Sequence, residues 1–313
     1  MYSNPILNLN NVLAKKDLIT ILDVDEQYID EVPGIIKYKN KILSVVKYIN
    51  KGVFGTVFNY SSVDGKYSVA VKTYVNDDDP EIEIIEAINS KDKMSACETV
   101  NSKILELYNS KTKKKSKVAV MDLMDGTLKD LIKFKLSSEI ILEIIFKLAN
   151  NLECLNNIGL IYSDLKGPNI LYKCFKNNNI KISLGDLGSI CAKGEWGTST
   201  YPPPEYTYPQ LENNCSESTM VWGLGVVLLE LLKINTNEIF AWDNTRSKWI
   251  GSYGNKFKDD AKYESREIFD EAVKKEVNNI ISLQTDDLIK LLLNRIFLES
   301  KRITLQEIIH LSK

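Results

Sequence analysis

The segment from Val221 to Leu232 constrains the fold of this chain most strongly. Its residues are apolar nearly all the way round the helix that they would form. A helix with no polar face is buried in a core or spans a membrane, and a membrane span needs about 20 consecutive apolar residues. No apolar run in the sequence approaches that length. We therefore predict a buried core helix at this segment.

The two parts of the chain differ in the secondary structure that they predict. Segments rich in β-branched residues predict strands in the first part, at residues 42–49, 57–60, 67–74, 104–108 and 117–123. One helix is predicted among them, at residues 81–88, after the start signal Asp77-Asp78-Asp79-Pro80. The second part predicts a hairpin of strands and several helices, at residues 128–134, 139–155, 170–172 with 180–184, and 288–311.

Composition excludes several classes of function. The 313 residues are 44% hydrophobic and 26% charged, which is typical of a soluble globular protein of one large domain or two lobes. The net charge of -2 gives no global basic field that would favour nucleic acid or an anionic membrane. Met1 is followed by neither a signal-peptide pattern nor the glycine needed for myristoylation, so neither is expected.

The cysteines and the histidine limit the chemistry further. The five cysteines are scattered, with no C-x-x-C pair, which indicates a reducing compartment with buried or inert thiols. His310 is the single histidine of the sequence. Zinc sites built on histidine, and catalysis by a Ser-His or Cys-His pair, are therefore excluded.

The stretch from Tyr162 to Asn169, called the Asp164 loop below, has a composition suited to phosphoryl transfer. Asp164, Lys166 and Asn169 place a carboxylate, an amine and an amide in a loop that contains glycine and proline. A carboxylate can take the proton of an attacking hydroxyl, a cation can neutralise the transferred group, and an amide can hold a metal. Taken alone, the same residues also fit an ordinary solvated turn.

Two features of the first part suit phosphate binding. Residues 50–57, called the glycine loop below, connect two predicted strands, and their glycines allow backbone N–H groups to approach phosphate oxygens. Lys72 ends the next strand, and Glu81, Glu83 and Glu86 are its candidate partners on the following helix. We prefer Glu86, because Ala87 and Ile88 continue an inward face beside it, and then Glu83. A plain hairpin turn and an exposed lysine are the alternatives.

Other polar positions stand at the ends of predicted elements. Asp186 lies between glycines at the end of a strand, which suits a metal ligand or a simple turn. Glu205 follows a proline-rich stretch that excludes helix and strand, and a buried glutamate there would need a cation. The basic turn at residues 111–115 fits a solvated loop, with substrate docking or nucleic-acid binding as the alternatives.

In this order, the pieces resemble the eukaryotic-type protein kinase superfamily, from about Ile42 to the C-terminus. The resemblance implies an α+β, bilobal protein-kinase-like fold. Its N-lobe is small and β-rich with one main helix, and its C-lobe is larger and mostly helical. The implied organisation is an N-terminal extension at residues 1–41, the N-lobe and hinge at 42–124, and the C-lobe at 125–313.

The resemblance also implies a role for each candidate residue. Asp164 is the catalytic base, Lys166 contacts the γ-phosphate, and Lys72 holds the α- and β-phosphates, paired with Glu86 or Glu83. Asn169 and Asp186 hold Mg²⁺, with Mn²⁺ as the alternative metal. The residues implied to bind ATP are Asn50, Lys51, Gly52, Val53, Phe54, Gly55, Val57, Ala70, Lys72, Met121, Asp122, Leu123, Met124 and Leu171.

The segment from Asp186 to Glu205 corresponds to the activation segment of the family, and it indicates the substrate class. Thr198 and Glu205 resemble the peptide-docking loop of serine/threonine kinases, and Arg302 resembles the arginine that pairs with that glutamate. With Lys166 in the Asp164 loop, the resemblance implies a protein substrate with a Ser or Thr acceptor. It implies no membrane or nucleic-acid partner, and it implies an intracellular, cytoplasmic location, or a virion if the AT-rich composition marks a large DNA virus.

Four departures from the family pattern are visible. Asn50 replaces the first loop glycine, Tyr162 and Ser163 replace the His-Arg pair before the base, and Met220 replaces an aspartate that braces the loop. Without that arginine, a phosphate on the short activation segment lacks an obvious cationic partner. We therefore expect activity without activation-loop phosphorylation, and no effect of changes at Ser189, Ser199 and Thr200. A pseudokinase that acts as a nucleotide-binding scaffold or a partner-binding module is the alternative.

Overall fold

The computed structural model describes most of the chain from residue 35 onward. The described residues are 35–52, 55–90, 102–109, 114–176, 179–194, 199–201, 203, 215–236, 239, 242–243, 248–249 and 266–313.

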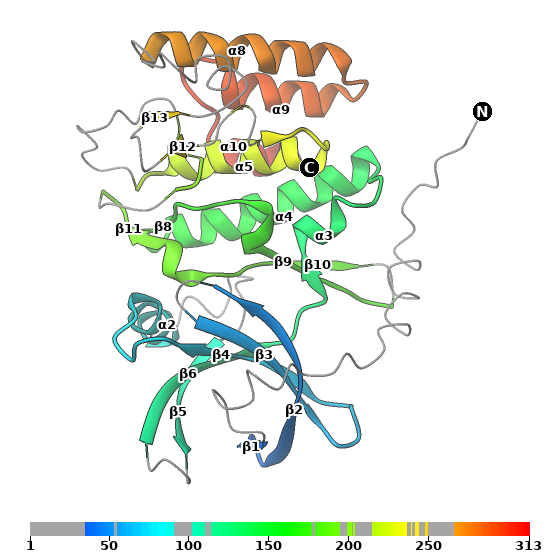
Figure 1. Ribbon diagram of the computed structural model, residues 1–313. Coiled ribbons are helices and arrows are strands. Elements are labelled where there is room, and N and C mark those ends of the chain that lie inside the picture. The colour runs from blue at the N-terminus through cyan, green and yellow to red at the C-terminus, as the bar shows by residue number, and fades with distance from the viewer. Residues whose placement is uncertain are drawn as a thin grey trace.

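The first part of the chain forms a six-stranded antiparallel sheet (Figure 1). In the order β1-β2-β3-β4-β6-β5, its strands are Ile35–Tyr38, Lys41–Lys51, Gly55–Ser62, Ser68–Tyr74, Lys114–Asp122 and Ser102–Asn109. Phe58, Tyr60 and Val71 are fully buried on the inner face of this sheet. Buried and partly buried positions alternate along most of β3, as expected for a strand whose two faces differ in burial.

One helix, α2 (Pro80–Ser90), packs beside this sheet (Figure 1). The Asp79 carboxylate accepts a hydrogen bond from the backbone N–H of Glu81, 3.0 Å away, and Pro80 stands at the first helical position. Glu81, Ile82 and Ile85 are buried, whereas Glu83, Glu86 and Ala87 are exposed. The buried face of α2 is therefore the one that carries Glu81, Ile82 and Ile85.

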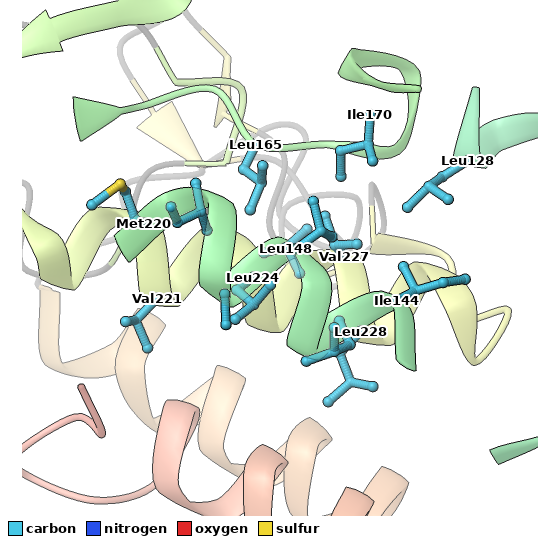
Figure 2. Packing of buried hydrophobic residues seen from close by; sticks show 14 of the residues in the cluster. Leu128, Ile144, Leu148, Leu165, Ile170, Met220, Val221, Leu224, Val227 and Leu228 are labelled. Atoms are coloured by element: carbon cyan, nitrogen blue, oxygen red, sulfur yellow. The ribbon is translucent and has the colours of Figure 1, made fainter. Parts of the chain in front are cut away.

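The second part is mostly helical, and its helices stack in layers beyond the sheet (Figure 1). They are α3 (Leu128–Leu131), α4 (Ser138–Asn156), α5 (Glu217–Leu231), α8 (Arg266–Leu283), α9 (Asp287–Phe297) and α10 (Leu305–His310). Figure 2 shows side chains of α4 and α5 meeting in one apolar cluster, with Leu148 beside Leu224 and Val227. Burial of this apolar area stabilises the helical part at about 25 cal/mol per Å².

The second part also contains short strands. They are β7 (Gly126–Thr127), β8 (Leu160–Tyr162), β9 (Ile170–Cys174), β10 (Ile180–Leu184), β11 (Ile190–Ala192), β12 (Trp242–Asp243) and β13 (Lys248–Trp249). Strand β9 lies between β10 and β7, and β11 pairs with β8. These pairings place the Asp164 loop, which follows β8, beside Asp186, which follows β10.

Most predicted elements are confirmed, with bounds that shift by a few residues. The buried core helix is α5, the long helix is α4 with Ser137 as its N-cap, and the predicted hairpin is β9 and β10. Strand β1 lies inside the stretch that the sequence assigned to an extension. Helix α8 and the β8–β11 pair were not predicted, because α8 is mostly polar and the paired strands are only three residues long.

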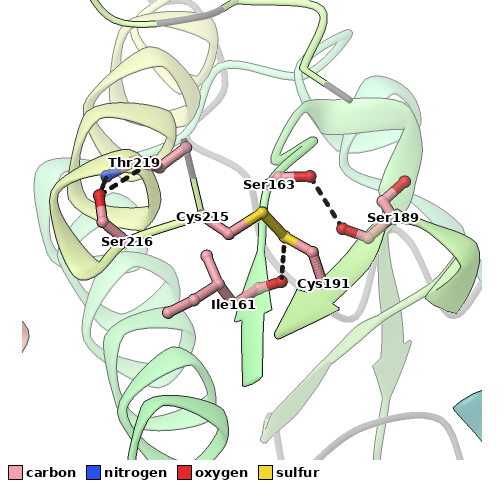
Figure 3. Close-up of a disulfide and its surroundings, with 7 residues drawn as sticks. All are labelled: Ile161, Ser163, Ser189, Cys191, Cys215, Ser216 and Thr219. Carbon is pink, nitrogen blue, oxygen red and sulfur yellow. Dashed lines mark hydrogen bonds between the residues drawn. A yellow bond between two sulfur atoms is a disulfide. The ribbon is translucent and has the colours of Figure 1, made fainter. Parts of the chain in front are cut away.

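The cysteines differ from the expectation. Cys191 and Cys215 form a disulfide (Figure 3), and Cys154 is disulfide-bonded as well. The prediction of thiols is therefore wrong for these residues, while Cys174 is buried as expected. The sequence did not reveal the bond, because the two cysteines are 24 residues apart and meet only through the tertiary structure. Pairing of β11 with β8 places Cys191 near the start of α5, where Cys215 lies.

The helices were also compared with the length of a bilayer. Within the described ranges, none is both long and apolar enough to cross a membrane.

Candidate active site

The Asp164 loop rests on the core helix α5. Leu165 packs into the apolar cluster that α5 forms with α4 (Figure 2). A side chain at Gly223 would place its Cβ 2.8 Å from the Cβ of Leu165, so only glycine permits this approach. The backbone N–H of Gly167 donates to the Glu230 carboxylate at 2.7 Å. Two contacts with α5, one apolar and one polar, thus fix the loop.

Asp164 is the centre of a hydrogen-bonded set. Lys166 Nζ lies 2.6 Å from its Oδ2, and the amide Nδ2 of Asn169 lies 3.3 Å from the same oxygen. The backbone N–H of Thr200 donates to Oδ1 at 2.6 Å, and Lys166 also donates to the Thr200 hydroxyl at 2.8 Å. The three residues predicted from the loop pattern therefore lie together. Thr200, which contacts Asp164 and Lys166, comes from the activation segment.

Lys72 forms an ion pair with Glu81, not with Glu86 or Glu83. The pair is largely buried, with 12% of the lysine and 5% of the glutamate side chain exposed. Glu86 is half-exposed and pairs with Lys117 at 3.3 Å instead. The preference for Glu86 is therefore wrong, because Ala87 lies on the exposed face of α2 and does not continue an inward one.

Glu81 also connects α2 to the residues around Asp186. Its Oε1 accepts a hydrogen bond from the backbone N–H of Leu187 at 3.2 Å, while its Oε2 holds Lys72. Asp186 has a positive φ of 49°, which is uncommon for a residue other than glycine. The buried Tyr162 hydroxyl donates to the carbonyls of Gly185 and Asp186 and so supports this strained turn.

Burial determines the ionisation of two groups at this point. Burial raises the pKa of Glu81 above its ordinary value of 4.5, although the charge of Lys72 acts in the opposite direction. Burial and the neighbouring charge of Asp186 raise the pKa of the Tyr162 hydroxyl well above 10. The phenol therefore stays protonated at neutral pH and can donate its hydrogen bonds.

We expect the activity to fall on the acid side at a pH set by Glu81. Protonation of Glu81 abolishes its ion pair with Lys72, and a raised pKa means that protonation occurs at a higher pH than for an ordinary glutamate. The pH profile of kcat/KM for ATP should therefore lose its uppermost acid limb in Glu81→Gln and keep it in Glu86→Gln. An identical acid limb in all three proteins would contradict this assignment.

The glycine loop approaches β4 closely. The backbone N–H of Gly52 donates to the carbonyl of Gly55 at 2.9 Å. A Cβ at Gly55 would lie 1.9 Å from the backbone oxygen of Thr73, so no side chain fits there. Asn50 stays in the extended conformation of β2 opposite Val57, and its side chain accepts a hydrogen bond from the backbone N–H of Lys51. Val53 and Phe54 lie outside the described residues.

The residues predicted to contact adenine lie near the start of β4, at and after the end of β6, and in β9. Ala70 pairs with Met121 across β4 and β6, next to Asp122. Leu123 and Met124 follow β6, and Lys173 donates to the Leu123 carbonyl at 3.0 Å. In β9, Leu171 lies against Gly185, since a Cβ on that glycine would be 3.1 Å from a Leu171 methyl. The described nucleotide residues thus lie in, or just after, β2, β3, β4, β6 and β9.

Asn169 and Asp186 are suited to hold a divalent metal. The side-chain amide nitrogen of Asn169 donates to Asp164, which leaves the side-chain oxygen Oδ1 as the ligand atom, and Asp186 offers a carboxylate. The backbone N–H of Gly185 donates to the backbone carbonyl of Asn169 at 2.7 Å and holds Asn169 beside Asp186. Among the described residues, no group of three or more His, Cys, Asp or Glu could hold a metal. This sparse oxygen set fits Mg²⁺ or Mn²⁺ bound together with phosphate.

Several predicted positions have other contacts or lie outside the description. Thr198 and Glu205 are outside the described residues, so the pairing of Arg302 with Glu205 stays a prediction. Arg302 donates to the hydroxyl of Ser218 and lies 5.1 Å from the Trp222 ring centroid. In the basic turn, residues 111–113 are outside the description, and Lys115 pairs with Glu106 at 3.0 Å.

Two residues that the sequence analysis did not select take part in the site. Thr200 bonds Asp164 and Lys166, and Glu230 braces the loop through Gly167. Burial raises the pKa of Glu230, and the Gly167 N–H acts in the opposite direction. A carboxylate within the apolar run from Val221 to Leu232 was the available signal for Glu230. Thr200 was not selected because the resemblance pointed to Thr198, which lies two residues earlier.

The departures from the family pattern have structural replacements. Ser163 donates through its hydroxyl to the Ser189 carbonyl at 2.9 Å, which ties the Asp164 loop to the activation segment (Figure 3). Met220 is fully buried in the cluster with Leu165 (Figure 2). Apolar packing at Met220 was expected, but Tyr162 also supplies a polar contact through its hydroxyl.

Comparison with known proteins gives several related kinases. A probable serine/threonine-protein kinase of Dictyostelium discoideum is 28% identical over 212 residues, which are 60% of this chain and 30% of that protein. Homeodomain-interacting protein kinase 1 of Caenorhabditis elegans is 25% identical over 201 residues, 60% of this chain and 23% of the relative. Serine/threonine-protein kinase pakE of Dictyostelium discoideum is 23% identical over 197 residues, 58% of this chain and 20% of the relative.

These matches span less than a third of each relative's own length. The family model described as protein kinase domain, in contrast, matches residues 43–312. Its range contains the glycine loop, Lys72, the Asp164 loop and Asp186. The sheet with one packed helix, the helical second part and this match agree. The chain therefore belongs to the protein kinase family.

Proposed function

We propose that the chain is an active serine/threonine protein kinase that transfers the γ-phosphate of ATP with Mg²⁺ as its metal. The observation that carries the proposal is a continuous set of contacts from Lys72 to Asp164. Glu81 joins Lys72 to Leu187, Gly185 joins Asp186 to Asn169, and Asn169 bonds Asp164. All four groups that phosphoryl transfer requires are present and held, which supports catalysis over a scaffold role.

The side chains divide the work of transfer. Asp164 orients a serine or threonine hydroxyl and accepts its proton, and Lys166 brings positive charge to the transferred group. Lys72, held by Glu81, binds phosphate oxygens, while Asn169 and Asp186 hold the metal. ATP supplies the phosphoryl group, and the bound metal neutralises charge on its phosphates. The short contacts of Asp164 keep its carboxylate in one orientation before substrate binds.

The contact of Lys166 with Thr200 supports a hydroxyl acceptor on a protein. It ties the activation segment, where the resemblance places peptide docking, to the base itself. The names of the relatives, serine/threonine-protein kinases in two of the three cases, agree with this substrate class.

Control by activation-segment phosphorylation is not part of the proposal. Ser163 stands where the family has an arginine, and its hydroxyl holds the Ser189 carbonyl directly. Ser189 is buried, so it is a poor acceptor for a phosphate. The contact between Ser163 and Ser189 thus holds the first part of the segment without a phosphate or an arginine, which supports activity of the unmodified chain.

For Thr200 the contact with Lys166 replaces the expectation of no effect by an expected loss of activity, whereas the expectation for Ser199 is unchanged. Thr200→Ala should lower kcat/KM about tenfold, because a hydrogen bond to a charged amine contributes about 1.5–3 kcal/mol and this one also holds Lys166. Thr200→Ser keeps the hydroxyl and should retain most activity, and Ser199→Ala should act as the matched neutral control. Steady-state rates with a protein substrate measure the three variants. Equal rates for Thr200→Ala and wild type would contradict the role of this contact.

Transfer of labelled γ-phosphate tests the function itself. The chain is incubated with labelled ATP, Mg²⁺ and generic basic and acidic protein substrates, and labelled residues are identified by phosphoamino-acid analysis. We expect label on serine or threonine. Label on tyrosine would overturn the acceptor class. Nucleotide binding without any transfer would favour the pseudokinase alternative.

A further inference from the structure

The Cys191–Cys215 disulfide joins the activation segment to the start of the core helix. Cys191 lies in β11, three residues after Gly188, and Cys215 directly precedes Ser216, the N-cap of α5 (Figure 3). The bond spans a sequence separation of 24 residues. Thr200, which contacts Asp164 and Lys166, lies within this covalently closed stretch.

Non-covalent contacts hold the same junction. Cys191 pairs with Ile161 in the β8–β11 ladder, and its sulfur lies 3.5 Å from the Ile161 carbonyl. The backbone N–H of Gly194 donates to the Cys215 carbonyl at 2.9 Å. Strand β8 leads directly into the Asp164 loop. The disulfide therefore fixes the first part of the activation segment beside β8, which leads into the Asp164 loop, and beside α5, on which that loop rests.

The two cysteines differ in the exposure of the whole residue. Cys215 is 1% exposed, whereas Cys191 is only partly buried and is followed by exposed Lys193 and Gly194. A small thiolate can therefore approach from the side of Cys191.

We propose that Cys191 and Cys215 are a reversible redox modification site that controls the kinase activity, with low-molecular-weight thiols and their disulfides as its reactants. This proposal rests on the proposed function. In the disulfide form, the closed loop keeps Thr200 on Asp164 and Lys166. In the dithiol form, the segment has more conformations, and the fraction with Thr200 in place falls.

The exchange is balanced in two steps. A thiolate attacks Cys191 Sγ, forms a mixed disulfide and releases the Cys215 thiolate, which takes up a proton. A second thiolate attacks the mixed disulfide at the sulfur of the small thiol, forms a small-molecule disulfide and releases Cys191 as a thiolate. Two small thiols are thereby oxidised while the protein disulfide is reduced. Oxidised glutathione reverses both steps.

The test compares the full chain after treatment with oxidised or with reduced glutathione. Mass spectrometry of alkylated peptides establishes the state of Cys191 and Cys215 in each sample. We expect kcat/KM for a protein substrate to be about fivefold or more higher in the disulfide form. Hydrogen exchange at the Thr200 amide, which donates to Asp164, should be faster in the dithiol form.

Variants separate this bond from the other cystine. The double variant Cys191→Ser, Cys215→Ser should show the low rate of the dithiol form under both treatments. Cys174→Ala is the matched control for loss of a cysteine, and it should respond as wild type does. A response to glutathione that persists in the double variant, which would trace it to Cys154, overturns the proposal. Equal rates of verified disulfide and dithiol forms overturn it as well.

The amide-exchange measurement distinguishes two kinds of failure. If neither form transfers phosphate, the proposed function fails. Faster exchange at Thr200 in the dithiol form would still support the proposal that the disulfide keeps Thr200 on Asp164. If both forms transfer phosphate equally and exchange equally, the redox proposal fails and the kinase function stands.

Discussion

Replacing Asp164 by alanine is expected to lower kcat about 10²–10⁴-fold, the range typical of removing a general base. Its carboxylate holds Lys166, Asn169 and the backbone of Thr200 at once, so the change also removes the centre of the hydrogen-bonded set. Nucleotide affinity should change little, because Lys72 and Glu81 are not in that set. Single-turnover transfer and titration with a fluorescent nucleotide measure the two quantities separately.

Asp287→Ala is a suitable control for Asp164→Ala. Asp287 lies in the first turn of α9 with 94% of its side chain exposed, and it contacts only a surface lysine by ion pairing among the described residues. The control should transfer phosphate at the wild-type rate. Undiminished transfer by Asp164→Ala would remove Asp164 from the role of base and with it the proposed mechanism.

Glu81→Gln is expected to lower kcat/KM for ATP about 10- to 100-fold, because a hydrogen bond to a charged group contributes about 1.5–3 kcal/mol and each 1.4 kcal/mol is a factor of ten. The substitution removes the charge that holds Lys72 and weakens the contact with Leu187, while it keeps the size of the side chain. The loss should appear mainly with ATP, because Lys72 is the phosphate-binding group. Steady-state kinetics at varied ATP concentration measure it.

Glu86→Gln provides the matched control on the same helix. Its carboxylate makes an exposed ion pair with Lys117, and exposed pairs contribute only about 0.2–1 kcal/mol. We expect activity within a factor of two of wild type. If Glu86→Gln instead produced the loss and Glu81→Gln did not, the assignment of the Lys72 partner from the structure would be refuted.

Much of the fold and of the site is predictable from local patterns. The apolar segment that became α5, the glycines around the turn at Gly55, and the Asp164 loop each carry their signal within a few neighbouring residues. Burial on all sides, close backbone approach and loop chemistry act over short stretches of chain. Together with the resemblance to the protein kinase superfamily, these features predicted the two-part architecture and selected Lys72, Asp164, Asn169 and Asp186.

The remaining choices depend on contacts between distant segments. Three glutamates of one helix were candidates in the sequence, and the burial of Ile82 and Ile85 is what places Glu81 inward and Glu86 outward. The partner of Lys72 was therefore decided by the rotation of α2 about its own axis. A shift of one residue in that packing rotates a helix by about 100°, which is enough to exchange the two faces.

The sequence by itself thus selected Lys72, Asp164, Asn169 and Asp186, because each belongs to a local motif. Tertiary structure alone decided how they are held. It brought Thr200 to Asp164, set Glu230 under Gly167, and joined Cys191 to Cys215. Those partners are far apart in the chain, and their meeting depends on how β8, β11 and α5 pack together. The physical reason is that a side chain's partner is fixed by the relative placement of whole elements, which no local pattern encodes.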